Sequence, residues 1–343
     1  MKKHLLNIIR KTNDVDKSQF DYVLSQNEKN FSAANDIFNT FLSKVTEKDI
    51  SFYPNTTNLK NRLAKLYLVE PKNLVLTPGS DIGIKTVFEA FDLKGKNVVT
   101  TDYCFPMYDV YSQIYEAELK KVPYEGMRME ISKLIDSIDA NTAFVILANP
   151  NSPLGDSYEI EDIRPLLKTG VPVIIDEAYR EFTPGTKYSS FISEFNNLIV
   201  LKTLSKGYGA AGLRIGSIIT NEVNIKYFES LRFMYEISSL STLYAECMLD
   251  EIERLKADIH KVMKLKERIL DSLKNSDYIT IDTDCSWFFL KKTDKLEKLF
   301  KRFKVDIREL TLPKLEGNWY KFNVDLILTN SPLLNELTSN SFQ

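Results

Sequence analysis

Short apolar runs alternate along this chain with stretches in which apolar residues recur every three or four positions. Strand-like segments lie near 74–77, 97–101, 119–123, 143–148, 171–176, 198–202 and 214–220. Between them, spacings such as that of Ile84, Val87, Phe88 and Phe91 are typical of helices. Strands that alternate with helices predict an α/β fold with a mainly parallel sheet, here of seven strands.

The last third of the chain has a different pattern. A charged region from 243 to 274 carries apolar residues at helical spacing and predicts a long helical segment. Short strands are expected near 278–290 and 319–328, on either side of a helix from Lys295 to Lys304. This part of the sequence therefore predicts a smaller α+β unit.

The length of the chain indicates two domains. Its 343 residues exceed the roughly 250–300 at which a single hydrophobic core stops growing. We expect a large domain over 45–245, and a small domain formed by 1–44 together with 246–343.

Composition narrows the classes of function. The formal net charge of −2 indicates neither a nucleic-acid nor a membrane partner. Three scattered cysteines favour a reducing compartment over a disulfide framework, and two histidines leave little material for a metal site. No apolar run of about 18 residues and no signal peptide is expected, so the sequence predicts a cytoplasmic protein.

The most informative stretch is Thr203-Leu204-Ser205-Lys206, which is followed by mostly small residues up to Arg214. It offers one amine, two hydroxyls and one guanidinium, which suit an aldehyde cofactor that binds a lysine as an imine and carries a phosphate. The stretch therefore predicts a pyridoxal 5'-phosphate site. The alternative is a Ser-Lys pair on a solvated loop without a chemical role.

A carboxylate follows the buried run at 171–176. This run ends in Asp176 and continues as Glu177-Ala178-Tyr179, at the edge of the sheet where open α/β sheets bind ligands. There Asp176 could keep a pyridine nitrogen protonated, because an opposite charge favours the charged form. The alternative is that Asp176 caps the start of a helix.

Two further turns follow predicted strands. The run at 143–148 leads into the segment 149–155, whose two prolines and glycine form a rigid turn that aims asparagines at a ligand or serves only as punctuation. The run at 74–77 passes through Pro78-Gly79 into a helix expected to begin near Ser80 or Asp81. Free amides at a helix start attract phosphate, although a serine there is more often only a cap.

Together these four elements, in this order, resemble the fold-type I pyridoxal-phosphate enzymes, and among them the class I/II aminotransferases close to histidinol-phosphate aminotransferase. The resemblance runs from about Asn27 to Arg308. It implies that Lys206 forms the Schiff base with the cofactor and that Arg214 binds the cofactor phosphate. It also implies that Asp176 contacts the pyridine nitrogen and that Tyr179 contacts the phenolic oxygen.

The resemblance implies further contacts. Amides at Ser80 and Asp81, after Gly79, and the hydroxyls of Thr203 and Ser205 would hold the phosphate. Phe105 would stack on the cofactor ring, which is worth roughly 0.5–1.5 kcal/mol beyond burial, unless it is ordinary core. Tyr53 is similar to a tyrosine that reaches the phosphate of the neighbouring subunit's cofactor, which implies a homodimer with shared sites.

Two departures from the family bear on the chemistry. Ser152 stands where the family has an asparagine on the phenolic oxygen, so Asn151, or Ser152 through a water, would replace that contact. Where the family has an arginine for the substrate carboxylate, the nearest cation is Lys321, a point charge that cannot make a bidentate fork. Arg308 and Asn27 are similar to family residues that lie beside the substrate.

Three hypotheses remain open. The first is an aminotransferase that acts on a small anionic, phosphorylated amine or ketone, with an amino donor and a keto acceptor. The second is a lyase of the same fold, such as a phospho-amino-acid decarboxylase resembling threonine-phosphate decarboxylase, which shares every cofactor motif quoted. The third is a non-catalytic descendant, which the intact Lys206, Asp176 and Arg214 argue against, whereas Ser152 and Lys321 leave it open.

Overall fold

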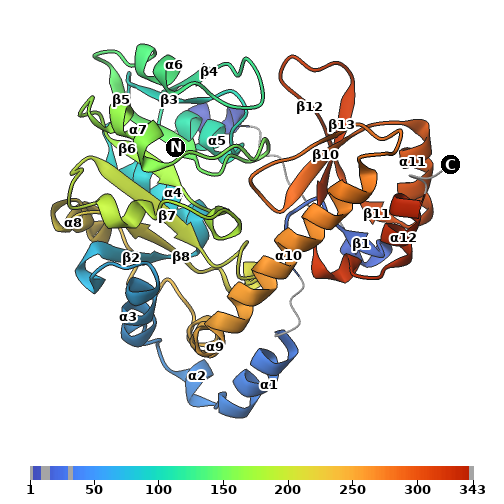
Figure 1. Ribbon diagram of the computed structural model, residues 1–343. Helices are drawn as coiled ribbons and strands as arrows, with labels where there is room; N and C mark the ends of the chain where they lie inside the picture. Colours follow the sequence, from blue (N-terminus) through green and yellow to red (C-terminus); the bar gives the residue numbers. More distant parts are fainter. Residues whose placement is uncertain (1–2, 9–15, 30–33, 340–343) are drawn as a thin grey trace.

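A seven-stranded sheet lies at the centre of the computed structural model, which describes residues 3–8, 16–29 and 34–339 (Figure 1). The strand order is β2-β8-β7-β6-β5-β3-β4. The strands are β2 (Leu74–Thr77), β3 (Asn97–Thr101), β4 (Glu118–Val122), β5 (Thr142–Ala148), β6 (Val173–Asp176), β7 (Leu198–Thr203) and β8 (Gly216–Ile219). Every expected segment overlaps one of these strands, so the predicted α/β fold is confirmed.

The sheet is mostly parallel. The strands β4, β3, β5, β6 and β7 pair in parallel, whereas β8 runs antiparallel to both of its neighbours, β7 and β2. All residues of β6 and β7 are buried, as expected for central strands covered on both faces. Ala148 pairs with Asp176, and Asp176 pairs with Leu201, so the carboxyl ends of three strands meet at one edge.

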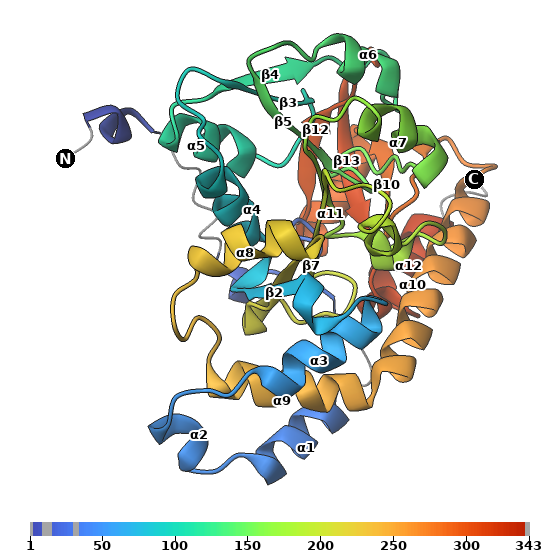
Figure 2. The ribbon, with the colours of Figure 1, turned by 90° about the vertical axis from the view of Figure 1, so that its left-hand side faces the viewer.

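Helices cover both faces of this sheet. Ile174 and Ile175 point to opposite cores, because a strand has a period of two residues. The core around Ile174 includes residues of α4 (Gly79–Ala90), α5 (Met107–Ile114) and α8 (Glu222–Ser230), which Figure 2 shows together. The core around Ile175 includes residues of α3 (Thr57–Leu66), α6 (Ile131–Asp136) and α7 (Ile160–Leu167).

A second, antiparallel sheet has the order β12-β13-β10-β9. Its strands are β9 (Thr280–Ile281), β10 (Trp287–Lys291), β12 (Arg308–Thr311) and β13 (Asn318–Asn323), and the accompanying helices are α11 (Asp294–Arg302) and α12 (Pro332–Ser339). The region near 278–290, where short strands are expected, contains β9 and most of β10, separated by a turn in which the Thr283 hydroxyl accepts from the Cys285 amide at 3.2 Å. The strand expected near 319–328 ends at Asn323.

The long helical region consists of two helices, α9 (Ser239–Asp250) and α10 (Ile252–Leu273), separated by Glu251. Along α10 the buried apolar residues recur every three or four positions, as an amphipathic helix requires. They are Leu255, Ile259, Val262, Leu265, Ile269 and Leu273.

The first residues of the chain contact several distant elements. The strand β1 (Tyr22–Val23) pairs in parallel with β11 (Val305–Asp306). The segment η1 (Lys3–Asn7) lies against α5, where His4 Nε2 is 3.2 Å from the Ile114 carbonyl oxygen. The helices α1 (Ala34–Lys44) and α2 (Lys48–Ser51) pack against α9. The division into domains at residues 45 and 245 stays a prediction.

Short 3-10 helices complete the described structure. They are η2 (Lys17–Gln19), η3 (Pro71–Asn73), η4 (Arg180–Phe182), η5 (Tyr188–Phe191), η6 (Ala211–Leu213) and η7 (Leu326–Leu328). Within residues 3–8, 16–29 and 34–339, no helix is long and apolar enough to cross a membrane. The same residues contain no group of three or more His, Cys, Asp or Glu side chains that could hold a metal ion.

Candidate functional site

A cavity of about 430 Å³ lies at the carboxyl ends of β5, β6 and β7. It is lined by residues that follow these strands, by the start of α4 and by part of the N-terminal segment. They are Gln26, Glu28, Ser80, Asp81, Phe105, Ala148, Ser152, Asp176, Ala178, Tyr179, Thr203, Ser205, Lys206, Ala211, Gly212 and Arg214. The structure therefore brings most of the predicted cofactor-binding residues together.

Asp176 is a buried carboxylate in the wall of this cavity, with 5% of its surface exposed. Its Oδ2 accepts a hydrogen bond from the Tyr108 hydroxyl at 3.1 Å, and its Oδ1 accepts one from the Ala178 amide at 3.2 Å. Burial raises the pKa of Asp176 to about 6, and these two hydrogen bonds oppose the rise. The alternative of a helix cap is wrong, because η4 begins at Arg180 after its cap Tyr179.

Lys206 presents its amine to the same cavity. Its Nζ donates to the backbone oxygen of Gln26 at 2.9 Å and lies 5.9 Å from the centre of the Tyr179 ring. The described residues provide no carboxylate partner for Lys206. Its amine therefore lies between the Gln26 carbonyl and the Tyr179 ring, where a ligand in the cavity can contact it.

Arg214 and the start of α4 form the opposite wall. Arg214 has a left-handed backbone, with φ of 54°, and its Nη1 donates to the Ala211 oxygen at 3.3 Å. Gly79 has a φ of 77°, a left-handed conformation that favours glycine, and a Cβ there would lie 2.5 Å from Arg214 Nη2 and displace the guanidinium. The helix begins at Gly79, one residue before the expected start, and Ser80 is therefore in its first turn and is not its cap.

Two hydroxyls lie beside this wall. The Thr203 hydroxyl donates to Ser205 Oγ at 2.9 Å, and both residues line the cavity. Arg214 forms no ion pair with any residue in the part of the chain that the structure describes. A guanidinium without a carboxylate, two hydroxyls and helix-start amides together favour a phosphate at this end of the cavity.

Phe105 and Ser152 also line the cavity, whereas Asn151 does not. The Asn151 amide nitrogen donates to the Tyr103 oxygen at 2.9 Å, and its side-chain oxygen accepts from the Leu154 amide at 3.0 Å. Both ends of this side chain thus fix the loop. The geometry favours Ser152 over Asn151 as the residue that faces a ligand.

The predicted substrate residues lie on the side of the second sheet. Asn27 is buried, and its amide nitrogen donates to the Tyr179 hydroxyl at 2.9 Å, while its oxygen accepts from Lys321 Nζ at 3.0 Å. Lys321 also lies 3.7 Å from the centre of the Trp287 ring. Arg308 is exposed on β12, directly opposite Lys321 on β13.

Tyr53 lies outside this cavity. Its side chain is 77% exposed and stacks on the exposed Tyr235, with ring centres 4.1 Å apart and planes inclined by 10°. Within a single chain it therefore has no contact with the residues around Lys206.

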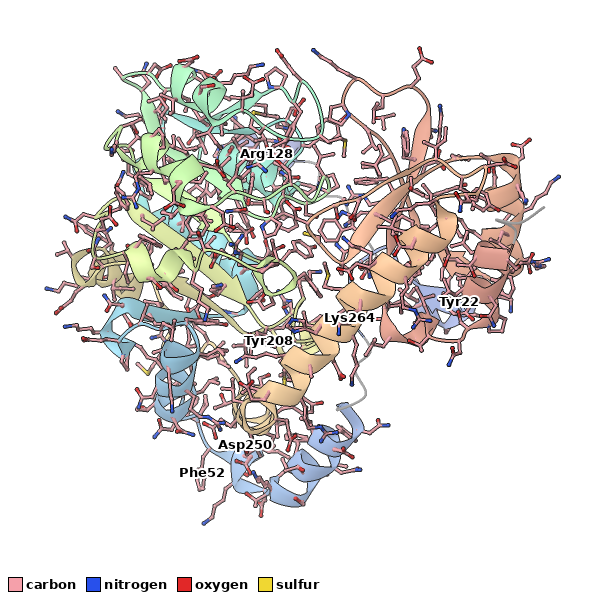
Figure 3. All side chains as sticks on the ribbon, viewed as in Figure 1. Tyr22, Phe52, Arg128, Tyr208, Asp250 and Lys264 are labelled. Carbon is pink, nitrogen blue, oxygen red and sulfur yellow. The ribbon has the colours of Figure 1, made fainter. Side chains whose placement is uncertain are left out.

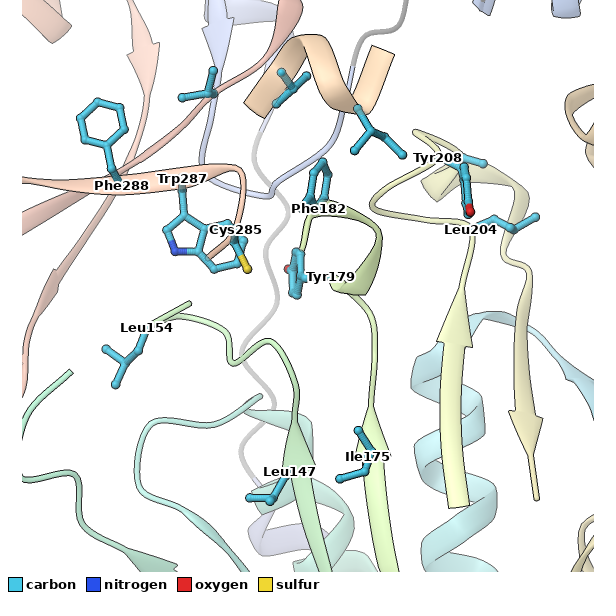
Figure 4. Close-up of a cluster of buried hydrophobic side chains, with 14 of the residues drawn as sticks. Leu147, Leu154, Ile175, Tyr179, Phe182, Leu204, Tyr208, Cys285, Trp287 and Phe288 are labelled. Atoms are coloured by element: carbon cyan, nitrogen blue, oxygen red, sulfur yellow. The ribbon is translucent and has the colours of Figure 1, made fainter. Parts of the chain in front are cut away.

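Three residues that the sequence did not single out contribute to the site: Tyr108, Trp287 and Lys29. Tyr108 holds Asp176, and Trp287 packs edge-on against Tyr179 with ring centres 5.0 Å apart (Figure 4). Lys29 is buried and donates to Asn323 and Val324 of the second sheet and its following turn. No motif in the sequence pointed to any of these three residues.

A larger cavity of about 510 Å³ lies between α10 and the segment 180–187, but the two buried cations that line it have carboxylate partners. Lys202 Nζ lies 2.6 Å from Glu177 Oε2, and Arg180 Nη2 lies 3.2 Å from Glu159 Oε1. The smaller cavity instead holds an amine and a guanidinium without carboxylate partners. It is therefore the better candidate for the reaction site.

The residues of this cavity fit pyridoxal 5'-phosphate. Arg214 and the first turn of α4 suit its phosphate, and Gly79 leaves room for the guanidinium. Asp176 suits its ring nitrogen, and Lys206 suits its aldehyde carbon.

Comparison with known proteins agrees with this arrangement. The family model described as aminotransferase class I and II matches residues 21–329. A histidinol-phosphate aminotransferase of Thermoanaerobacter pseudethanolicus is 34% identical over 287 residues, which cover 82% of this chain and 81% of that protein.

Solved structures share the fold. The histidinol-phosphate aminotransferase of Sinorhizobium meliloti, in complex with pyridoxal-5'-phosphate, has a TM-score of 0.83 at 20% identity, over 98% of this chain and 94% of that chain. The L-threonine-O-3-phosphate decarboxylase of Porphyromonas gingivalis has a TM-score of 0.76 at 20% identity, over 93% of this chain and 98% of that chain. At this identity, fold alone does not separate the two activities.

Proposed function

Because this chain belongs to the family of class I and II aminotransferases, we propose that it transfers an amino group between a small phosphorylated amine and a keto acid, with pyridoxal 5'-phosphate in the cavity around Lys206. One observation carries the proposal. The Lys206 amine, the buried Asp176 carboxylate and the Arg214 guanidinium, which has no carboxylate partner among the described residues, line the same cavity.

Each residue has a distinct role in this proposal. Arg214, Thr203 and Ser205, with the amides at Ser80 and Asp81, bind the phosphate and so orient the ring. Asp176 keeps the ring nitrogen protonated through charge attraction. When bound, the cofactor withdraws electrons from the reacting carbon of the substrate.

Lys206 is the general base and acid of the proposed reaction. With the cofactor held by these residues, Lys206 Nζ would remove the proton from the substrate Cα and return it in the course of amino transfer. Tyr179 and Ser152 would face the phenolic oxygen, and Phe105 would stack on the ring. The hydrogen bond from Asn27 to the Tyr179 hydroxyl fixes the direction in which that hydroxyl can donate.

The proposed substrate is anionic, since two basic side chains lie beside the cavity on the side of the second sheet. Lys321 and Arg308 face each other across β12 and β13, and Asn27 links Lys321 to Tyr179. The relative from T. pseudethanolicus is named for histidinol phosphate, a phosphorylated amine. We propose the same class of substrate for this chain.

The proposed active unit is a homodimer. Exposed apolar side chains gather near Tyr53 and Tyr235, and Phe52 projects outward in Figure 3. The exposed residues of these segments include Ile50, Phe52, Phe233 and Met234. A second subunit would cover them and receive Tyr53 in its own cavity.

We also propose that 45–245 form the large domain and that 1–44 with 246–343 form the small one.

The first test is a half-reaction with L-glutamate alone. The cofactor-loaded protein should convert its cofactor into the amine form and release one equivalent of 2-oxoglutarate, measured by absorbance and by chromatography. The Lys206→Ala variant should fold, bind the cofactor without a covalent bond and give no turnover.

Two outcomes would refute this function. The first is wild-type turnover in the Lys206→Ala variant. The second would indicate the lyase. In that case the protein releases carbon dioxide from a phosphorylated amino acid, and no amino donor converts the cofactor into its amine form. Each outcome requires a product to appear, so a poorly folded sample, which would form none, cannot be mistaken for either result.

A further inference from the structure

Two lysines other than Lys206 are buried beside the cavity. Lys321 is 1% exposed and Lys29 is 6% exposed, and neither forms an ion pair with a residue that the structure describes. A buried ammonium without a carboxylate is costly, because it loses its hydration and gains no opposite charge. These lysines therefore need either an anion from outside or the loss of their protons.

Lys29 has a local explanation. Its Nζ donates to Asn323 Oδ1 at 2.8 Å and to the Val324 oxygen at 2.6 Å. Burial lowers the pKa of Lys29 to about 7, and the charge of Asp325 opposes that fall. Lys29 thus ties the N-terminal segment to the second sheet through acceptors that belong to the protein.

Lys321 has no comparable set of acceptors. Its Nζ donates to Asn27 Oδ1 at 3.0 Å, and its other near neighbour is the face of the Trp287 ring. The ring attracts a cation and offsets part of the cost of burial. It replaces neither a carboxylate nor water as a hydrogen-bond partner.

The groups around Lys321 are mostly cationic. Arg308 approaches from β12, Lys29 from the N-terminal segment and Lys206 from the loop after β7. Burial, and then the charge of Arg308, hold the pKa of Lys321 well below its usual range. Burial raises the pKa of the Cys285 thiol, so this residue supplies no negative charge near neutral pH.

One amide connects Lys321 to the cavity. Asn27 accepts from Lys321 and donates to the Tyr179 hydroxyl, and Tyr179 lines the cavity. Gln26 and Glu28, on either side of Asn27, also line it. An anion that displaced the Asn27 oxygen would give Lys321 a charged acceptor, which forms a stronger hydrogen bond than a neutral amide.

We propose that Lys321 is a neutral amine in the free enzyme and takes up one proton from solvent when an oxyanion of the substrate replaces Asn27 Oδ1 as its acceptor. The inference rests on the proposed function, since it assumes that an anionic substrate enters this cavity. It also gives a reason for lysine at this position. Arginine keeps its proton at all relevant pH values and could not couple binding to protonation.

The test is calorimetric titration of the cofactor-loaded protein at pH 8 with glutarate and, separately, with sulfate. Both anions are fully ionised at this pH, so the ligand contributes no proton. Heats measured in Tris and in triethanolamine buffer should indicate uptake of close to one proton per bound anion. Affinity should fall about tenfold for each further unit of pH.

Two matched variants locate the proton. Lys321→Arg should still bind the anion, with proton uptake near zero. Lys29→Arg places a permanent charge at the other buried lysine and should leave the uptake unchanged. Lys321→Met should weaken binding at least tenfold, with thermal unfolding as the check that the variant is folded.

Several results would overturn the inference. One is that the wild-type protein binds an anion without taking up a proton. Another is that the uptake is lost in Lys29→Arg but kept in Lys321→Arg. A third is that neither anion binds. A preference for sulfate over glutarate would identify a tetrahedral group as the ligand of Lys321, and the reverse would identify a carboxylate. Failure of the glutamate half-reaction with proton uptake intact would refute the proposed function alone.

Discussion

The buried carboxylate of Asp176 should destabilise the cofactor-free protein at neutral pH. Burial raises its pKa from an ordinary value of 3.8 to about 6. Between these pH values the folded protein holds a proton that the unfolded chain has released, so the free energy of unfolding falls as pH rises. At about 1.4 kcal/mol per pKa unit, a difference of roughly two units corresponds to about 3 kcal/mol.

The Asp176→Asn variant removes this titration and keeps an oxygen that can accept from Tyr108. Without cofactor, its free energy of unfolding relative to wild type should rise by about 3 kcal/mol between pH 4 and pH 6 and stay constant above. The new amide group adds a cost of its own, but this cost does not depend on pH. Urea unfolding followed by tryptophan fluorescence, with both proteins at each pH, measures the difference.

Bound cofactor should turn the Asp176 carboxylate from a destabilising group into a stabilising one. With the cofactor bound, the Asp176 carboxylate gains a protonated ring nitrogen as its partner, so wild type should gain more stability from the cofactor than Asp176→Asn does at pH 8. A stability difference that stays constant from pH 4 to pH 8 would refute the reasoning. So would an equal gain of the two proteins from the cofactor.

Three further predictions follow from the same contacts. Tyr108→Phe removes a hydrogen bond to a charged group, which is worth about 1.5–3 kcal/mol. The pKa of Asp176 should therefore rise by about one to two units, as measured by carbon NMR of the cofactor-free protein. An unchanged pKa of Asp176 would contradict this prediction. Gly79→Ala places a Cβ 2.5 Å from Arg214 Nη2 and should weaken cofactor binding at least tenfold in a fluorescence titration. Gly95 has a similar positive φ but open space around it, so Gly95→Ala should leave cofactor binding unchanged. If subunits share sites, mixing the inactive Lys206→Ala variant with the impaired Tyr53→Ala variant should restore activity. Half of the dimers are then mixed and each mixed dimer has one intact site, so the activity should approach roughly a quarter of wild type. No recovery would argue against Tyr53 in the partner's site.

Local patterns made the main sheet and its cofactor edge predictable. The strands β2, β5, β6 and β7 are short apolar runs, and most residues that line the cavity follow strand ends, where parallel strands bring separate segments together. Lys206 and Arg214 share one short loop, so their proximity is set by the sequence itself. Lys206 and Asp176 meet because β6 and β7 are neighbours.

Contacts between distant segments were not predictable. Tyr108 reaches Asp176 from a helix on one face of the sheet, and no spacing in the sequence relates these two residues. The strand β12 begins with the exposed Arg308 and Glu309 and has no apolar run, so only its hydrogen bonds to β13 define it. Asn151 and Ser152 are adjacent in sequence, and the loop conformation alone decides which of them faces the cavity.

The parallel pairing of β1 with β11 affects the order in which the site can form during synthesis. Gln26 and Glu28 line the cavity just after β1, and β1 is paired with Val305 and Asp306. A ribosome that has already released all seven strands of the large sheet has not yet made β11. The nascent chain can therefore fold the phosphate-binding edge early, but the wall that carries Gln26 must wait for the C-terminal strands. A chain that ended before Val305 would keep Lys206 and Arg214 but would leave the cavity open on the side where the substrate is expected.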